Sequence, residues 1–181
     1  MNLIIVVGII AVLGFLISAY NKGISLQNYT KEAFSVMDVY LKKRFDLLPN
    51  LVEIVKQYAQ HENNVFVEVA NLRTKAYSNL SMDEKMELNT ELKGAISKIV
   101  AVAENYPEVK ANENFKTLMG QLENIENDIA KSRKYYNGTV RELNNYTQMF
   151  PTNLICMLFN IKQQRFFEAS EDERQNVEVK F

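Results

Sequence analysis

The feature that most constrains this chain is an uncharged apolar run from Leu3 to Tyr20. As a helix, the run would be roughly 27 Å long, close to the roughly 30 Å thickness of bilayer hydrocarbon. It therefore predicts one transmembrane helix within an anchor of residues 1–22, with residues 3–20 in contact with the lipid bilayer. The span is marked by Leu3, Ile10, Phe15 and Tyr20.

The residues around this run bear on cleavage and on orientation. A secretory signal peptide is the alternative to a retained anchor, but no Lys or Arg precedes the run and Ser18-Ala19-Tyr20 makes a poor cleavage site. Lys22 and Lys31 follow the run closely, and basic residues favour the cytoplasmic side. We therefore expect a single-pass cell-membrane protein whose soluble domain lies in the cytoplasm.

After the anchor, residues 23–169 have the apolar spacing of packed helices and are predicted to form a helical bundle domain. Apolar residues recur every three or four positions from Leu26 to Ala76, which is the period of an amphipathic helix. We predict a helix over about residues 25–79 that is kinked at Pro49, because proline removes one backbone hydrogen bond and crowds the preceding turn.

Cap residues and prolines predict where the later helices begin and end. Ser81 followed by Glu84 fits a capping box for a helix over about residues 82–105, which ends before Pro107. Asn112 is the expected cap of a helix over about residues 113–149.

That third helix carries a near-heptad apolar seam, which predicts coiled-coil-like packing. Its seam residues are Phe115, Leu118, Leu122, Ile125, Ile129, Tyr136, Val140, Leu143 and Phe150. Pro151 stops it, and a short apolar helix over residues 152–161 is expected to cap the end of the bundle. Residues 170–181 are predicted to form a charged and partly extended tail. The predicted fold is therefore all-α: one N-terminal transmembrane helix followed by an elongated antiparallel helical bundle with long coiled-coil-like helices.

The residue types that carry chemistry are scarce. The formal net charge of -1 argues against a nucleic-acid partner, which requires a basic face. His61-Glu62 lacks the second histidine of a zinc-protease helix, because Val65 stands at that position. Cys156 lies among apolar neighbours, where a cysteine is usually a small core residue. We predict no catalytic residue, no metal, no cofactor, no small-molecule substrate and no enzymatic activity.

Several polar residues fall on or beside the apolar stripes. Buried polar groups destabilise a fold unless they are paired, and paired ones can fix helix register. These polar residues have two possible roles: they form a polar network that fixes the register of the bundle, or they form a groove near the kink where a partner docks. The residues assigned to this interaction or register cluster are Arg44, Asp46, Pro49, Asn50, His61 and Asn137.

Several segments follow one another in an order that matches a known family. They include the run Asp38–Glu53, Tyr58-Ala59-x-His61-Glu62, the stretch Tyr106–Phe115, Ile129-Ala130-x-x-Arg133-x-x-Tyr136-Asn137 and Phe166-Phe167-Glu168. These segments resemble the signature of the LemA family. The resemblance covers essentially Tyr20 to Phe181. It implies a bacterial protein with an N-terminal membrane helix and an elongated helical bundle, and it implies no particular reaction.

The predicted function is a membrane-anchored, non-enzymatic scaffold or adaptor that self-assembles or recruits partners through its helical faces. The candidate partners besides lipid are a second copy of the chain and an unidentified membrane or cytoplasmic protein. One alternative is an accessory or sensor subunit of a membrane enzyme or transporter. A further alternative is a lattice protein that remodels membranes.

Overall fold

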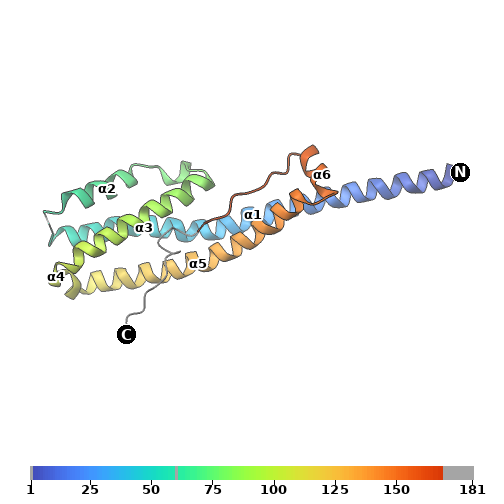
Figure 1. Cartoon of the computed structure of the whole chain (residues 1–181). Helices are drawn as coiled ribbons and strands as arrows, with labels where there is room; N and C mark the ends of the chain where they lie inside the picture. The colour runs from blue at the N-terminus through green and yellow to red at the C-terminus, as the bar shows by residue number, and fades with distance from the viewer. Residues whose placement is uncertain (1, 60, 169–181) are drawn as a thin grey trace, which may run out of the picture. The chain divides into compact units, whose positions relative to one another are not determined.

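The structure is a computed structural model that describes residues 2–59 and 61–168. Its elements, in chain order, are α1 (Asn2–Lys56), α2 (Asn63–Arg73), the 3-10 helix η1 (Tyr77–Asn79), α3 (Met82–Glu104), α4 (Pro107–Ala111), α5 (Glu113–Gln148) and α6 (Thr152–Leu158) (Figure 1). The described residues contain helices and no strand, which confirms the predicted all-α class. The predicted extended tail, residues 170–181, lies outside the described residues.

The apolar run forms the first part of α1, and its side chains are exposed except that of Ala19. From Leu3 to Ile17 the large apolar residues have no covering partner surface, and Leu3 itself is 76% exposed. By length and composition, α1 is the one helix in the described part of the chain that could cross a membrane.

Downstream, α1 differs from the predicted helix in where it ends. It continues through Pro49, the position of the predicted kink, to Lys56. It does not reach Asn79, because the chain turns after Lys56 and α2 begins at Asn63. The periodicity missed this reversal since α1 and α2 both turn apolar stripes toward a shared core, so the spacing continues across the turn.

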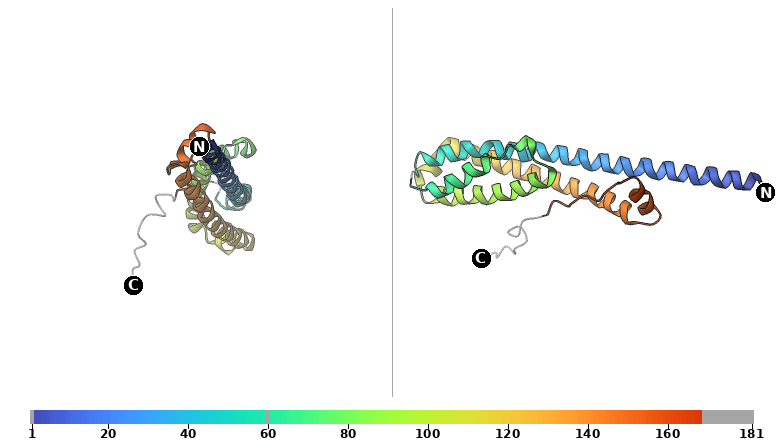
Figure 2. Two further views of the ribbon diagram at one scale, coloured as in Figure 1. Left: turned by 90° about the vertical axis from the view of Figure 1, so that its right-hand side faces the viewer. Right: turned by 90° about the horizontal axis from the view of Figure 1, so that it is seen from above.

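The chain divides into two compact units. The second unit consists of Val36–Lys131 with, among the described residues, Phe167 and Glu168. Four helical segments of this unit lie side by side and alternate in direction (Figures 1 and 2). They are the latter part of α1, the whole of α2, the whole of α3 and the first part of α5. Its fully buried side chains include Leu48, Leu51 and Val55 of α1 and Leu92 and Ile99 of α3.

Local signals fix where the helices of this unit begin. Ser81 and Glu84 form the predicted capping box, since the Ser81 hydroxyl accepts from the Glu84 amide and the Glu84 carboxylate accepts from the Ser81 amide. Asn112 Oδ1 accepts hydrogen bonds from the amides of Asn114 and Phe115, so it caps α5 as predicted. Pro107 does not merely end α3 but starts α4, where a first-turn proline is well tolerated.

The first unit consists of the chain up to Ser35 together with Ser132–Phe166. Here α5 runs antiparallel to α1, because Tyr136 packs against Phe34 whereas Tyr146, further along α5, reaches back to Ala19. One face of α6 closes the core: Cys156 is buried with Leu26, Leu143 and Ile161. Of the predicted seam, Phe150 is instead 80% exposed, because α5 ends at Gln148 and the chain turns there.

Candidate interaction surface in the second unit

A buried arginine joins three helices of the second unit. Arg44 of α1 is only 4% exposed. Its Nη1 donates to Asn89 Oδ1 on α3 at 2.7 Å, and its Nη2 forms an ion pair with Glu126 on α5. A guanidinium withdrawn from water is tolerated only when its hydrogen bonds and charge are met by fixed partners. Arg44 therefore ties α1, α3 and α5 in one register.

Two of these side chains, Arg44 and Glu126, border an open groove of about 730 Å3 between α3 and α5. Apolar side chains line part of it, namely Ile96 from α3 and Phe115, Met119 and Leu122 from α5. Four basic and two acidic side chains also line it: Arg44, Lys93, Lys110, Lys116, Glu123 and Glu126. The groove thus combines an apolar lining with basic side chains, of which Arg44 is paired with Glu126 and Lys116 with Glu113.

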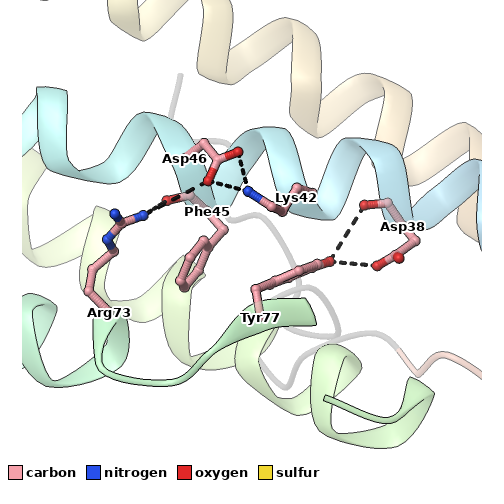
Figure 3. Close-up of polar contacts among 6 residues, drawn as sticks. All are labelled: Asp38, Lys42, Phe45, Asp46, Arg73 and Tyr77. Carbon is pink, nitrogen blue, oxygen red and sulfur yellow. Dashed lines mark hydrogen bonds and ion pairs between the residues drawn. The ribbon is translucent and has the colours of Figure 1, made fainter. Parts of the chain in front are cut away.

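On another side of α1 a polar cluster surrounds the Phe45 ring (Figure 3). The Arg73 guanidinium lies 4.8 Å from the ring centroid, and its Nη1 donates to the Phe45 carbonyl oxygen at 3.5 Å. That carbonyl is the one left without a helical donor by Pro49, four residues later. Arg73 also lies 3.9 Å from the Asp46 carboxylate, which pairs with Lys42. The contact from α2 helps explain how α1 continues through a proline.

Next to it, Tyr77 fastens η1 to α1. The Tyr77 hydroxyl donates to Asp38 Oδ1 at 2.7 Å, and Lys85 Nζ contacts Asp38 Oδ2 at 2.7 Å (Figure 3 shows the tyrosine contact). Burial, followed by the hydrogen bond and the negative charge of Asp38, raises the pKa of Tyr77 far above its usual value. Tyr77 is therefore a neutral hydrogen-bond donor at any physiological pH, suited to holding structure.

The residues assigned to the interaction or register cluster belong to both units, and those near Pro49 face different neighbours. Arg44 faces α3 and α5, whereas Asp46 faces Lys42 and Arg73. Asn50 is exposed on α1, and His61 lies in the exposed turn between α1 and α2. Asn137 is half-buried on the α5 segment of the first unit.

Sequence reasoning missed Asn89, Glu126, Tyr77 and the basic lining of the groove. Asn89 and Glu126 contact Arg44, and Tyr77 contacts Asp38. The partners in each pair are about 40 residues or more apart in the sequence, and no local spacing indicates such pairs. Within the described residues no group of three or more His, Cys, Asp or Glu is placed to hold a metal ion. Cys156 is buried, and burial raises the pKa of its thiol, so it lacks the thiolate character of a nucleophile.

The fold and this surface define a class: a helical-bundle protein with one N-terminal helix long and apolar enough to cross a membrane. The LemA family profile matches residues 33–181. The chain belongs to the LemA family.

Named relatives are distant but cover most of the chain. It is 24% identical to Protein LemA of Metamycoplasma hominis, over 84% of this chain and 70% of that protein. It is 22% identical to Magnetosome protein MamQ 1 of Paramagnetospirillum magneticum, over 90% of this chain and 70% of the relative. It is 21% identical to Magnetosome protein MamQ of Magnetospirillum gryphiswaldense, over 90% of this chain and 69% of that relative.

Proposed function

We propose that this protein is a non-enzymatic adaptor of the cell membrane. Residues 3–20 cross the bilayer, and the groove between α3 and α5 binds an acidic, amphipathic segment of a partner protein. The observation that carries the proposal is the groove itself, whose apolar lining is combined with four basic side chains and two acidic ones.

The anchor is supported by the exposure of the apolar part of α1. Side chains such as Ile4 and Ile10, which are 78% and 63% exposed, are stable in lipid but not in water. Lys22 and Lys31 favour a cytoplasmic bundle. Intact mass spectrometry of the chain extracted from membranes tests the anchor. A mass that includes residues 3–20 supports it, and a chain that starts after Tyr20 shows a cleaved signal instead.

The chemistry of the groove defines its occupant. A helix that presents Leu or Ile to Phe115, Met119 and Leu122 would remove these side chains from water. Carboxylates on the flanks of that helix would meet Lys110 and would compete with Glu113 for Lys116. Self-assembly through this groove requires a second copy to supply such a segment, and the test below includes that outcome.

Two glycines offer a matched test of the groove. Gly120 lines the groove, and a Cβ added there meets no atom within 4 Å. Gly94 on α3 is exposed, lies outside the groove and has equally open surroundings. Replacing either glycine with leucine favours the helix, but only Gly120→Leu puts a bulky side chain into the groove.

The probe is a synthetic amphipathic helix with Leu on one face and Glu on its flanks, and its control carries Lys in place of Glu. Binding to the full chain in detergent micelles is followed by fluorescence anisotropy. We expect the Glu peptide to bind in a salt-sensitive way, the Lys peptide not to bind, and Gly120→Leu but not Gly94→Leu to weaken binding at least about tenfold.

The assignment of the groove would be overturned if the Glu and Lys peptides bound equally well, or if the Glu peptide bound equally well to the Gly120→Leu and Gly94→Leu variants. Concentration-dependent self-association of the full chain that competes with the peptide and is lost in Gly120→Leu would replace the foreign partner with a second copy. The intact-mass result is independent of either outcome.

A further inference from the structure

The end of the first unit exposes a cluster of apolar side chains that we call the tip, Met149–Phe159. It comprises the turn after α5 and all of α6. Phe150 is 80% exposed and Met157 78% exposed, and the other exposed apolar members are Met149, Leu154, Leu158 and Phe159. From Met149 to Ile161 the sequence contains no charged residue. Such a surface is unusual in water.

This exposure is not a consequence of loose packing, because the opposite face of α6 is fixed. Ile155 and Cys156 are 4% and 2% exposed, and Cys156 packs against Leu26, Leu143 and Ile161. The Thr152 hydroxyl donates to the Tyr146 carbonyl oxygen at 2.7 Å and so holds the start of α6 to the end of α5. The helix is thus apolar on its core face and on its outer face, a pattern that occurs where the surroundings are apolar on both sides.

Contacts within the unit place the tip beside the last residues of the apolar run. The rings of Phe159 and Tyr20 pack with their centroids 4.6 Å apart. The Tyr146 hydroxyl donates to the Ala19 carbonyl oxygen at 2.7 Å. Ile161 approaches Gly23 so closely that a Cβ on the glycine would lie 2.7 Å from Ile161 Cδ1. The tip therefore lies at the level where α1 would leave the bilayer.

We propose that the tip inserts into the surface of the bilayer beside α1, so that the first unit is held by lipid at two points. This inference rests on the proposed function, in which residues 3–20 cross the membrane. The exposed apolar face of α6 would occupy the boundary between acyl chains and headgroups, where interfacial helices bury their apolar side.

The residues around the tip fit this boundary. Tyr20 and Tyr146 each have an apolar ring and a polar hydroxyl, the composition favoured at membrane interfaces. Lys162 is exposed just after the tip, where it would meet anionic headgroups. The occupant that the continuity with α1 indicates is thus a phospholipid surface and not a partner protein.

Fluorescence quenching by lipid tests the proposal in the full chain. In a Cys156→Ala background, whose helicity is checked by circular dichroism, single cysteines replace Leu158 at the tip, Ile10 in the span or exposed Glu142 on α5. Each is labelled with an environment-sensitive fluorophore and reconstituted in phosphatidylcholine and phosphatidylglycerol vesicles, with and without brominated acyl chains. Brominated lipid quenches only fluorophores that reach the acyl region.

We expect brominated lipid to quench the fluorophores at positions 10 and 158 and to leave the one at position 142 unchanged. A further Met157→Glu substitution, at a side chain that contributes little to the core, should reduce quenching at position 158 and not at position 10.

Quenching at position 10 without quenching at position 158 would overturn the tip insertion and leave the anchor standing. A blue-shifted but unquenched fluorophore at position 158 would show that protein covers the tip, which also overturns the inference. Absence of quenching at both positions would contradict the anchor itself.

Discussion

We predict that replacing Glu126 lowers the free energy of unfolding more than replacing Arg44, although the two residues form one ion pair. Only Arg44 is deeply buried: its side chain is 4% exposed, whereas that of Glu126 is 40% exposed. In Glu126→Gln the guanidinium stays buried and loses its countercharge. In Arg44→Met the remaining carboxylate can be hydrated, and the methionine fills much of the vacated volume.

The magnitudes follow from these exposures. Breaking a fully buried ion pair costs about 3–5 kcal/mol, and since Glu126 is partly exposed we expect about 2 kcal/mol for Glu126→Gln. Arg44→Met loses a charged hydrogen bond to Asn89, about 1.5–3 kcal/mol, but buries an apolar side chain of similar worth, so its net cost is about 1 kcal/mol or less. In the double variant Glu126→Gln should add almost nothing, because no buried charge remains.

Reversible thermal or guanidinium unfolding of the full chain in detergent micelles, followed by circular dichroism, measures these differences. For a chain of this size Glu126→Gln should lower the Tm by about 4–8 °C and Arg44→Met by less than half of that. Glu68→Gln, which removes the exposed partner of Lys98, is the matched control and should change stability by less than about 1 kcal/mol. A larger cost for Arg44→Met than for Glu126→Gln, or strict additivity in the double variant, would refute the argument.

Three other predictions concern packing, capping and pH. Gly23→Leu should lower the Tm because its side chain collides with the core, whereas Gly138→Leu, in open surroundings, should be neutral or stabilising; thermal unfolding compares them. Ser81→Ala should cost about 1 kcal/mol in denaturant unfolding. It should also reduce, but not abolish, the stability that is lost as pH falls through the lowered folded pKa of Glu84, because the variant loses the hydroxyl hydrogen bond to Glu84 and keeps the backbone amide bond, which lowers that pKa most. Tyr77 has a raised folded pKa, so the stability it contributes is present below about pH 10 and lost at higher pH, where the unfolded phenol ionises; Tyr77→Phe should flatten the unfolding free energy measured across that range.

Features that depend on neighbours in sequence could be predicted. The apolar run, the Ser81 capping box and the Asn112 cap are each set by residues within a turn or a continuous segment, and the structure has them where the sequence indicated. Helical spacing likewise gave the positions of α3 and α5 closely.

Features that depend on distant partners could not be predicted. Pro49 indicates the loss of one backbone hydrogen bond, but nothing local indicates that Arg73, from another helix, donates to the Phe45 carbonyl that the proline leaves without a helical donor. The spacing of Phe150 continues the α5 seam, yet its side chain is exposed because the helix ends two residues earlier. The lining of the groove comes from α1, α3, α4 and α5, and nothing in the spacing within one helix reports how these helices meet.

The most direct test of the adaptor is photo-crosslinking from the groove in native membranes. A photoreactive amino acid replaces Met119 in the full chain, with Gly120→Leu and Gly94→Leu as paired backgrounds, and the crosslinked peptides are sequenced. The account predicts one dominant protein adduct whose crosslinked segment is acidic and amphipathic, lost with Gly120→Leu and kept with Gly94→Leu. An adduct that is unaffected by Gly120→Leu, or a groove that crosslinks to no protein in intact membranes, would contradict it.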